Sequence, residues 1–217
     1  MSNGVVGGDE PGWQDLSKNR AGQSARKRAV ELRKEAPIKS VLARLLGSPR
    51  EERDWAVGAD GEEEVAWRLR KLGGGWHVIH SVPVGEKGAD IDHVVIGPAG
   101  VFTLNTKNHS KHRVTVTQGG VDVNGQRTDY LRNSRFEAKR ASKLLTAACS
   151  NAEVQPVIVI MAADFKIKSE PTDVNVVGRK SIARWLTKRP AVLTPQRVEE
   201  IFEQARRETT WKPEVSA

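Results

Sequence analysis

The chain has 217 residues, 38% of them hydrophobic and 29% charged, which supports one folded domain of ordinary size with a tail. Its net charge of +8 favours an anionic partner, and nucleic acid is the first candidate. Cys149 is the only cysteine, which excludes an intrachain disulfide and a cysteine-based zinc site and suits a reducing cytoplasm. There is no apolar signal core and no membrane-spanning run, so we expect a soluble, cytoplasmic protein with no membrane partner.

The N-terminal region is polar and basic. Residues 1–16 are rich in glycine and acidic residues without periodicity, and we expect a disordered tail there. Residues 17–50 predict a basic helical arm, in which Pro37 ends a first helix and Gly47 closes a shorter second one. Such an arm packs loosely as a solvated segment, binds nucleic acid, or docks a partner.

Residues 51–211 predict one α/β domain, followed by a C-terminal tail at 212–217. The expected elements, in chain order, are a helix (58–72), a strand (76–84), a hairpin (89–97 and 100–108), a second hairpin (113–117 and 121–125), a long helix (132–149), two short strands (156–161 and 173–178) and two helices (181–189 and 194–209). This order predicts a mixed β-sheet flanked by helices.

The first hairpin brings polar side chains together. Because side chains alternate along a strand, a register symmetric about the turn at 98–99 places Asp92 opposite Asn105 and Asp90 opposite Lys107. By the same alternation His93 points to the other face, where we expect a packed or capping histidine rather than a general base.

The first helix adds another carboxylate. Glu62 lies on the apolar stripe of that helix, at helical spacing from Val65 and Leu69. Oxygen ligands from Asp92 and Glu62, beside Lys107, would suit a Mg²⁺ or Mn²⁺ ion and phosphodiester hydrolysis. The alternative is structural, with a cross-strand ion pair from Asp90 to Lys107 and with Asp92 as a capping or hydrogen-bonding residue.

These residues resemble the nuclease-related domain family, which belongs with the restriction-endonuclease-like, PD-(D/E)xK superfamily. The matching segments are G-A-D-G-E at 58–62, D-I-D-H-V-V-I-G-P-A-G-V-F at 90–102 and T-K-N at 106–108. The resemblance implies a restriction-endonuclease-like mixed sheet and a magnesium-dependent phosphodiesterase that acts on nucleic acid, DNA first. It carries metal-site roles to Glu62, Asp92 and the triplet 105–107 that ends at Lys107. The catalytic candidates are Lys107, Asp92 and Asn105.

The chain departs from the motif at Asn105, where the superfamily usually has an acid. An amide offers an oxygen without negative charge, which weakens its attraction for Mg²⁺. Asn105 is therefore either a weak metal ligand in a working site, or the mark of a module that binds nucleic acid or protein without cutting. Glu137 on the long helix could supply a relocated carboxylate; alternatively it pairs with Lys139 or Arg140 on a solvated face.

A basic segment follows Lys107. We expect residues 108–113 to form a loop whose nucleic-acid-binding candidates are His109, Lys111, His112 and Arg113. The alternative is an ordinary surface loop.

Overall fold

The computed structural model describes residues 12–24, 26–27, 30, 50–84 and 89–212. Residues 23–24, 26–27 and 30 are helical, whereas most of the predicted basic arm, most of the N-terminal tail and residues 213–217 lie outside the described residues. None of the described helices is long and apolar enough to cross a membrane.

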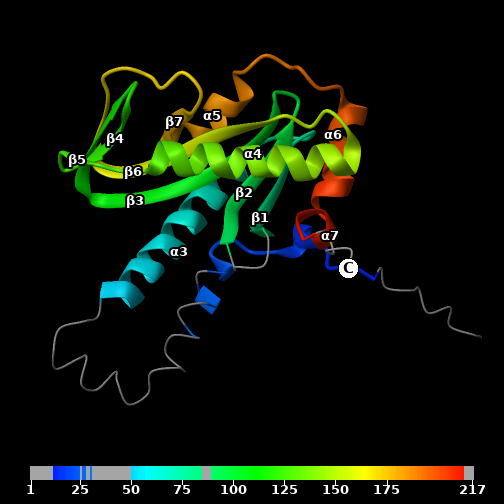
Figure 1. Cartoon of the computed structure of the whole chain (residues 1–217), viewed down its shortest axis with the longest axis horizontal. Coiled ribbons are helices and arrows are strands. Elements are labelled where there is room, and N and C mark those ends of the chain that lie inside the picture. Colours follow the sequence, from blue (N-terminus) through cyan, green and yellow to red (C-terminus); the bar gives the residue numbers. More distant parts are fainter. Residues whose placement is uncertain (1–11, 25, 28–29, 31–49, 85–88, 213–217) are drawn as a thin grey trace, which may run out of the picture.

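The described chain follows the predicted order of elements (Figure 1). In order they are η1 (Leu16–Lys18), α3 (Arg50–Leu69), β1 (His77–Val84), β2 (Ala89–Gly97), β3 (Gly100–Thr117), β4 (Gly120–Val123), β5 (Gln126–Arg127), α4 (Tyr130–Cys149), β6 (Val154–Ile167), β7 (Asn175–Gly178), η2 (Arg179–Ser181), α5 (Ile182–Thr187), α6 (Pro195–Ala205) and α7 (Glu208–Trp211). Thr194 caps α6 by accepting from the Arg197 N–H, as a Thr-Pro helix start predicts.

The strands form one seven-stranded mixed sheet, which confirms the predicted fold class. β1, β2 and the first part of β3 make an antiparallel meander, and the last part of β3 pairs with β4. β6 runs parallel to β3 and then pairs with β7. β3 is therefore the central strand of the sheet. It pairs with β2 and β4 in antiparallel fashion and with β6 in parallel.

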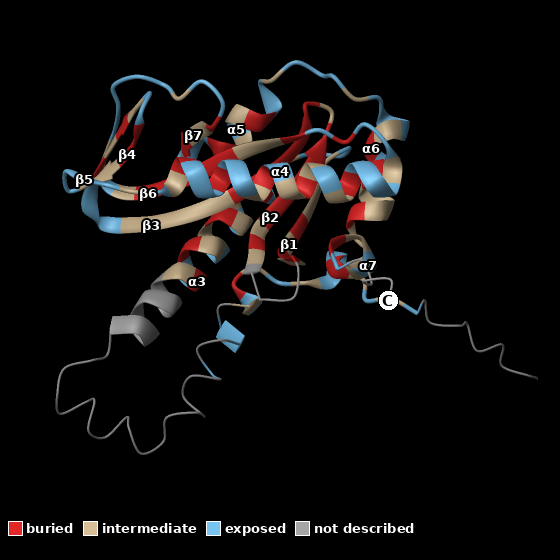
Figure 2. Ribbon diagram, viewed as in Figure 1, coloured by how far each residue is buried: buried red, intermediate tan, exposed pale blue. Residues whose placement is uncertain are grey.

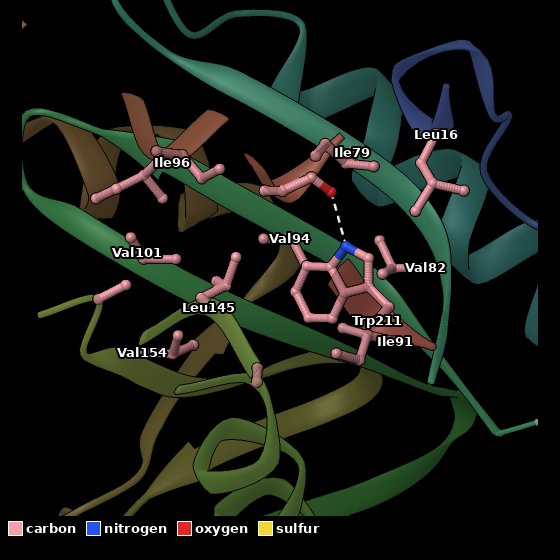
Figure 3. Close-up of a cluster of buried hydrophobic side chains, with 14 of the residues drawn as sticks. Leu16, Ile79, Val82, Ile91, Val94, Ile96, Val101, Leu145, Val154 and Trp211 are labelled. Atoms are coloured by element: carbon pink, nitrogen blue, oxygen red, sulfur yellow. Dashed lines mark hydrogen bonds between the residues drawn. The ribbon is translucent and has the colours of Figure 1, made fainter. Parts of the chain in front are cut away.

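Helices cover both faces of the sheet. On one face α4, α6 and α7 enclose a core in which Trp211 lies among Val82, Ile91 and Val94 (Figure 3). The Trp211 indole donates to the Ala205 carbonyl oxygen at 2.7 Å, which satisfies its buried polar group. On the other face α3 and α5 cover a second core cluster. Buried and exposed positions alternate along α4, as expected for a helix that packs on a sheet (Figure 2).

The end of the predicted N-terminal tail belongs to the folded domain. Leu16 is fully buried in the core of the α4 face, and its N–H donates to the Arg206 carbonyl oxygen at 2.7 Å. Asp15 forms an ion pair with Arg206 at 2.5 Å. The expected disorder of residues 1–16 is thus wrong for Asp15 and Leu16, because contacts with the distant C-terminal helices hold a segment whose own sequence has no periodicity.

Candidate functional site

The candidate site lies where β2 and β3 separate. Their antiparallel register runs from Gly97–Gly100 to His93–Leu104, which is the symmetric register predicted from the turn. The pairing ends there, so Asp92 and Asn105 do not continue the ladder. Instead the Thr106 N–H, free of a strand partner on that side, donates to Asp92 Oδ2 at 2.6 Å. The Asp92 carboxylate thus supplies the hydrogen-bond acceptor that a neighbouring strand would otherwise offer to the Thr106 N–H.

One edge of β3 stays open beyond this point. β6 pairs with β3 from Val101 to Val116, so β2 and β4 must share the opposite edge. β2 pairs only up to Leu104, and β4 only from Val114 onward. The open stretch of 105–113 contains most of the residues that the sequence singled out.

This stretch corrects the predicted basic loop. Residues 109–113 are part of the long strand β3, with a register shift against β6 between His109 and Arg113. Lys111 and His112 are exposed there, and Arg113 forms an ion pair with Asp164 at 3.1 Å. The polar sequence predicted a loop, but parallel pairing with a long β6 satisfies the backbone on both sides of the shift.

A second correction concerns the faces of β2. Ile91 packs in the same core cluster as Val94 and Ile96, although simple alternation puts it on the other face. The ladder with β1 skips Ser81 and Asp92, and Ser81 has a φ of 47°. This irregularity breaks the alternation next to Asp92, which local sequence patterns do not indicate.

His93 packs as predicted. It is fully buried, and its Nδ1 lies 2.8 Å from Nδ1 of His80. Burial lowers the pKa of both histidines. These two neutral rings belong to the interior of the sheet.

Glu62 reaches the site from α3 because Gly61 allows a close approach. A Cβ built at Gly61 would lie 3.1 Å from the Asn108 Cβ and 3.4 Å from the Thr106 methyl carbon. The next residue, Glu62, therefore lies beside the strand edge that carries Thr106. Glu62 Oε2 accepts a hydrogen bond of 3.0 Å from the Gly22 N–H, so the N-terminal segment also contacts the site.

Glu137 reaches the site from α4, on the opposite face of the sheet. The Asn105 amide nitrogen donates to Glu137 Oε2 at 3.0 Å. In the described part of the chain Glu137 accepts from Asn105 and forms no ion pair with Lys139 or Arg140, which was the alternative for this acid. The structure thus supports the contact needed for a relocated carboxylate.

Lys107 contacts an aromatic ring, and the described residues form no ion pair with it. Its Nζ lies 5.0 Å from the centroid of the Tyr130 ring, and Tyr130 Oη is 2.9 Å from His109 Nε2. Within the described residues no ion pair joins Lys107 to Asp90, so the structural alternative for this pair does not form. Tyr130 is a site neighbour that sequence reasoning missed, because the helix was expected to start at residue 132.

The charges of these groups are coupled. Burial, with the charges of Asp92 and Asp90, raises the pKa of Glu62 to about 8. Burial raises the pKa of Asp92 to about 6, although the Thr106 N–H and Lys107 oppose this shift. Burial and the Asp92 charge raise the pKa of Glu137 to about 7. The charge of Asp92 thus disfavours ionisation of both Glu62 and Glu137, Lys107 offsets part of this effect, and a cation would relieve the repulsion.

The donor atoms suit a hard divalent cation. Asn105 Oδ1 and Glu137 Oε1 are buried oxygens without a hydrogen-bond partner in the described structure. No three His, Cys, Asp or Glu side chains of the described residues are close enough to enclose an ion. Mg²⁺ does not need such a cage, since it usually binds one or two carboxylates and keeps several waters.

The fold and this arrangement define a class of protein, an α/β protein with a restriction-endonuclease-like mixed sheet. Residues 57–161 match the family model of the nuclease-related domain, and this part of the chain belongs to that family. The match includes α3 from residue 57 onward, the β2–β3 hairpin and α4, and thus all the residues placed at the site except Gly22. No curated protein and no solved structure matches the chain.

Proposed function

We propose that this protein is a metal-dependent nuclease that cleaves DNA. The observation that carries the proposal is that Glu62 and Glu137 both lie near Asp92 and Lys107, with pKa values raised by burial and by the charge of Asp92. Membership in the nuclease-related domain family and a net charge of +8 support the same conclusion. The single cysteine suits a cytoplasmic nuclease.

The oxygens of Asp92 and Asn105, with either Glu62 or Glu137, would hold Mg²⁺ or Mn²⁺ and leave its other positions to water. When bound, such an ion supplies a hydroxide nucleophile at neutral pH and neutralises charge on the phosphate. Glu137 provides the negative charge that Asn105 lacks, and its contact with the Asn105 amide orients the Asn105 oxygen. The Thr106 N–H holds Asp92 in position.

Lys107 is the group that acts on the substrate. Its ammonium carries no competing ion pair in the described structure, so it is available to a phosphate oxygen. A fixed positive charge stabilises the additional negative charge of the phosphorane-like transition state more than that of the ground state. The Tyr130 ring limits the positions that the lysine side chain can take.

The second candidate is a nucleic-acid-binding module without catalysis. It is favoured by the neutral Asn105 at the position of the usual acid, since loss of one charged ligand weakens metal binding. It predicts salt-dependent binding of DNA without metal-stimulated cleavage.

The two candidates are separated by a cleavage assay on linear, circular and single-stranded DNA with Mg²⁺ or Mn²⁺. The nuclease proposal predicts that wild type cuts DNA and that EDTA stops it. Cleavage by Asn105→Asp but not by wild type would identify a lapsed enzyme. Salt-dependent DNA binding without cleavage by either protein would favour the binding module, and no binding at all would contradict both candidates.

A further inference from the structure

A pocket of about 440 Å³ adjoins the candidate site. His109 and His112 of β3 line it on one side, and Asn124, Gln126 and Tyr130 complete much of its wall. Its lining residues belong to β3, the β4–β5 hairpin and the start of α4. Figure 1 shows these elements together at one end of the sheet. The acids of the site do not line this pocket.

Flat rings form much of the wall. His109 and Tyr130 are nearly parallel, with an interplanar angle of 18° and ring centroids 5.7 Å apart. His112 meets His109 at 67°, with centroids 6.1 Å apart. Aromatic walls of this kind favour a planar ligand, because nucleobases stack on such rings whatever their sequence.

The polar groups of the pocket have defined roles. The Asn124 side-chain oxygen accepts from the Arg113 N–H at 3.0 Å, so its amide nitrogen is the donor to His112 Nδ1 at 2.8 Å. His112 therefore carries its proton on Nε2 when neutral. No hydrogen bond among the described residues holds the Gln126 amide, which is free to donate and accept at a base edge.

Few positive charges of the pocket are free to bind a phosphate, which favours a nucleobase as the ligand. The Arg127 guanidinium is already bound to Asp122 Oδ1 and to the Gly119 carbonyl oxygen, each at 2.6 Å. Burial, with the charges of His112 and Lys107, lowers the pKa of His109 and favours its neutral form. A phosphate group needs free positive charge, and most of the positive charge here is already neutralised or bound.

We infer that this pocket binds one unpaired nucleobase of a nucleic-acid strand whose phosphate lies at Lys107. The inference rests on the proposed function for its substrate class. Lys107 and His109 are two residues apart on one strand, a step of about 6–7 Å. Tyr130 contacts both side chains, so a strand lying along the open edge of β3 meets the lysine first and then the pocket. The substrate at this site is therefore single-stranded or locally unpaired.

The test compares two fluorescent probes in EDTA, a short single-stranded oligothymidine and an equally long strand of abasic deoxyribose phosphates. We expect wild type to bind the strand with bases about fivefold or more tightly, since stacking of one base has at least this value. The double variant His112→Ala, Gln126→Ala should lose most of this preference, because it removes one ring of the wall and the amide at the base edge. Gln118→Ala, an exposed amide on the neighbouring β3–β4 turn, is the matched control and should retain the preference.

Equal binding of the two probes by wild type would overturn the inference, as would a preference that persists in the double variant. DNA cleavage measured alongside separates this failure from that of the proposed function. Cleavage without a base preference leaves the nuclease standing and removes the nucleobase pocket. A base preference lost in the double variant, without any cleavage, retains the pocket and removes the nuclease.

Discussion

The amide nitrogen of Asn105 donates to Glu137 Oε2 at 3.0 Å, and this contact joins the central strand to α4 close enough to Asp92 for its charge to raise the pKa of Glu137. The remaining oxygen of each side chain is buried without a partner in the described structure. Ala138, next to Glu137, is buried against the sheet, so α4 holds the Glu137 carboxylate at a fixed distance from the sheet. The pair therefore presents one negative charge and two oxygens where a single acid is usual.

The first prediction is that Glu137 supplies the charge that Asn105 lacks. Glu137→Gln keeps the shape and an oxygen that accepts from Asn105, but removes the charge. We expect cleavage to fall about 10–100-fold, as is common when a group that supports a metal site is changed. Kinetics of DNA cleavage at saturating Mn²⁺ measure the effect.

A charge swap makes this prediction specific. The double variant Asn105→Asp, Glu137→Gln returns the charge to the strand and should recover roughly tenfold of the lost rate. Glu153→Gln, an exposed acid beyond α4, is the control and should match wild type. Wild-type cleavage by Glu137→Gln would show that the carboxylate has no part in the site.

Stability should depend on pH through the crowded carboxyls. Asp92, Glu137 and Glu62 have raised pKa values of about 6, 7 and 8, so the folded state binds protons that the unfolded state has already released. When the folded state holds more protons, stability falls as pH rises. The buried histidines, whose pKa values are lowered, act in the opposite direction below about pH 6.5. Without divalent ions, we therefore expect the melting temperature to fall from about pH 6.5 to about pH 8, by roughly 3 °C or more.

Thermal melts in EDTA and in Mg²⁺ measure this dependence. Glu62→Gln should flatten the upper part of the fall, because its carboxyl has the highest pKa of the three. Mg²⁺ should restore stability most at the alkaline end, where the site is fully charged. A melting temperature that rises steadily over this window in EDTA would contradict the coupling.

The close approach of α3 depends on Gly61. Gly61→Ala would place a Cβ 3.1 Å from that of Asn108, and neither carbon can move without its backbone. We expect this variant to be less stable than Gly58→Ala by about 1–3 kcal/mol, the usual cost of overpacking. Gly58 is the matched control in the same helix, since a Cβ at Gly58 would meet nothing within 4 Å. Equal unfolding free energies from urea titrations would argue against a tight α3–β3 contact.

The N-terminal segment should contribute to the stability of the domain. Leu16 is fully buried, so Leu16→Ala is expected to cost about 2–5 kcal/mol of unfolding free energy. Lys18→Ala, an exposed neighbour, should change it by less than about 0.5 kcal/mol. Chemical denaturation compares the two, and a neutral Leu16→Ala would mean that the segment is dispensable.

Local patterns predicted most of the fold. The order of helices and strands, the register about Pro98 and Ala99, and the N-cap of α6 all follow from periodicity and turn chemistry in short segments. The site was predictable to the extent that it depends on that hairpin, which carries Asp92, Asn105 and Lys107.

The remaining features depend on contacts between distant segments. β3 continues through His109–Arg113 because β6 pairs with it, and no local pattern indicates a partner so far along the chain. Leu16 is buried by helices that come nearly two hundred residues later, as its bond to Arg206 shows. The Asn105–Glu137 contact likewise requires knowing how α4 crosses the sheet. Composition and spacing alone cannot supply these placements.

The measurement that tests the central claim most directly is cleavage of single-stranded and duplex DNA with Mn²⁺ by wild type, Lys107→Ala and Lys188→Ala. Lys188 is an exposed lysine directly after α5, outside the candidate site, and serves as the matched control. We predict metal-dependent cleavage by wild type, a loss of about 100-fold or more in Lys107→Ala, and near-normal cleavage in Lys188→Ala. Cleavage that persists undiminished in Lys107→Ala would contradict the assignment of this site.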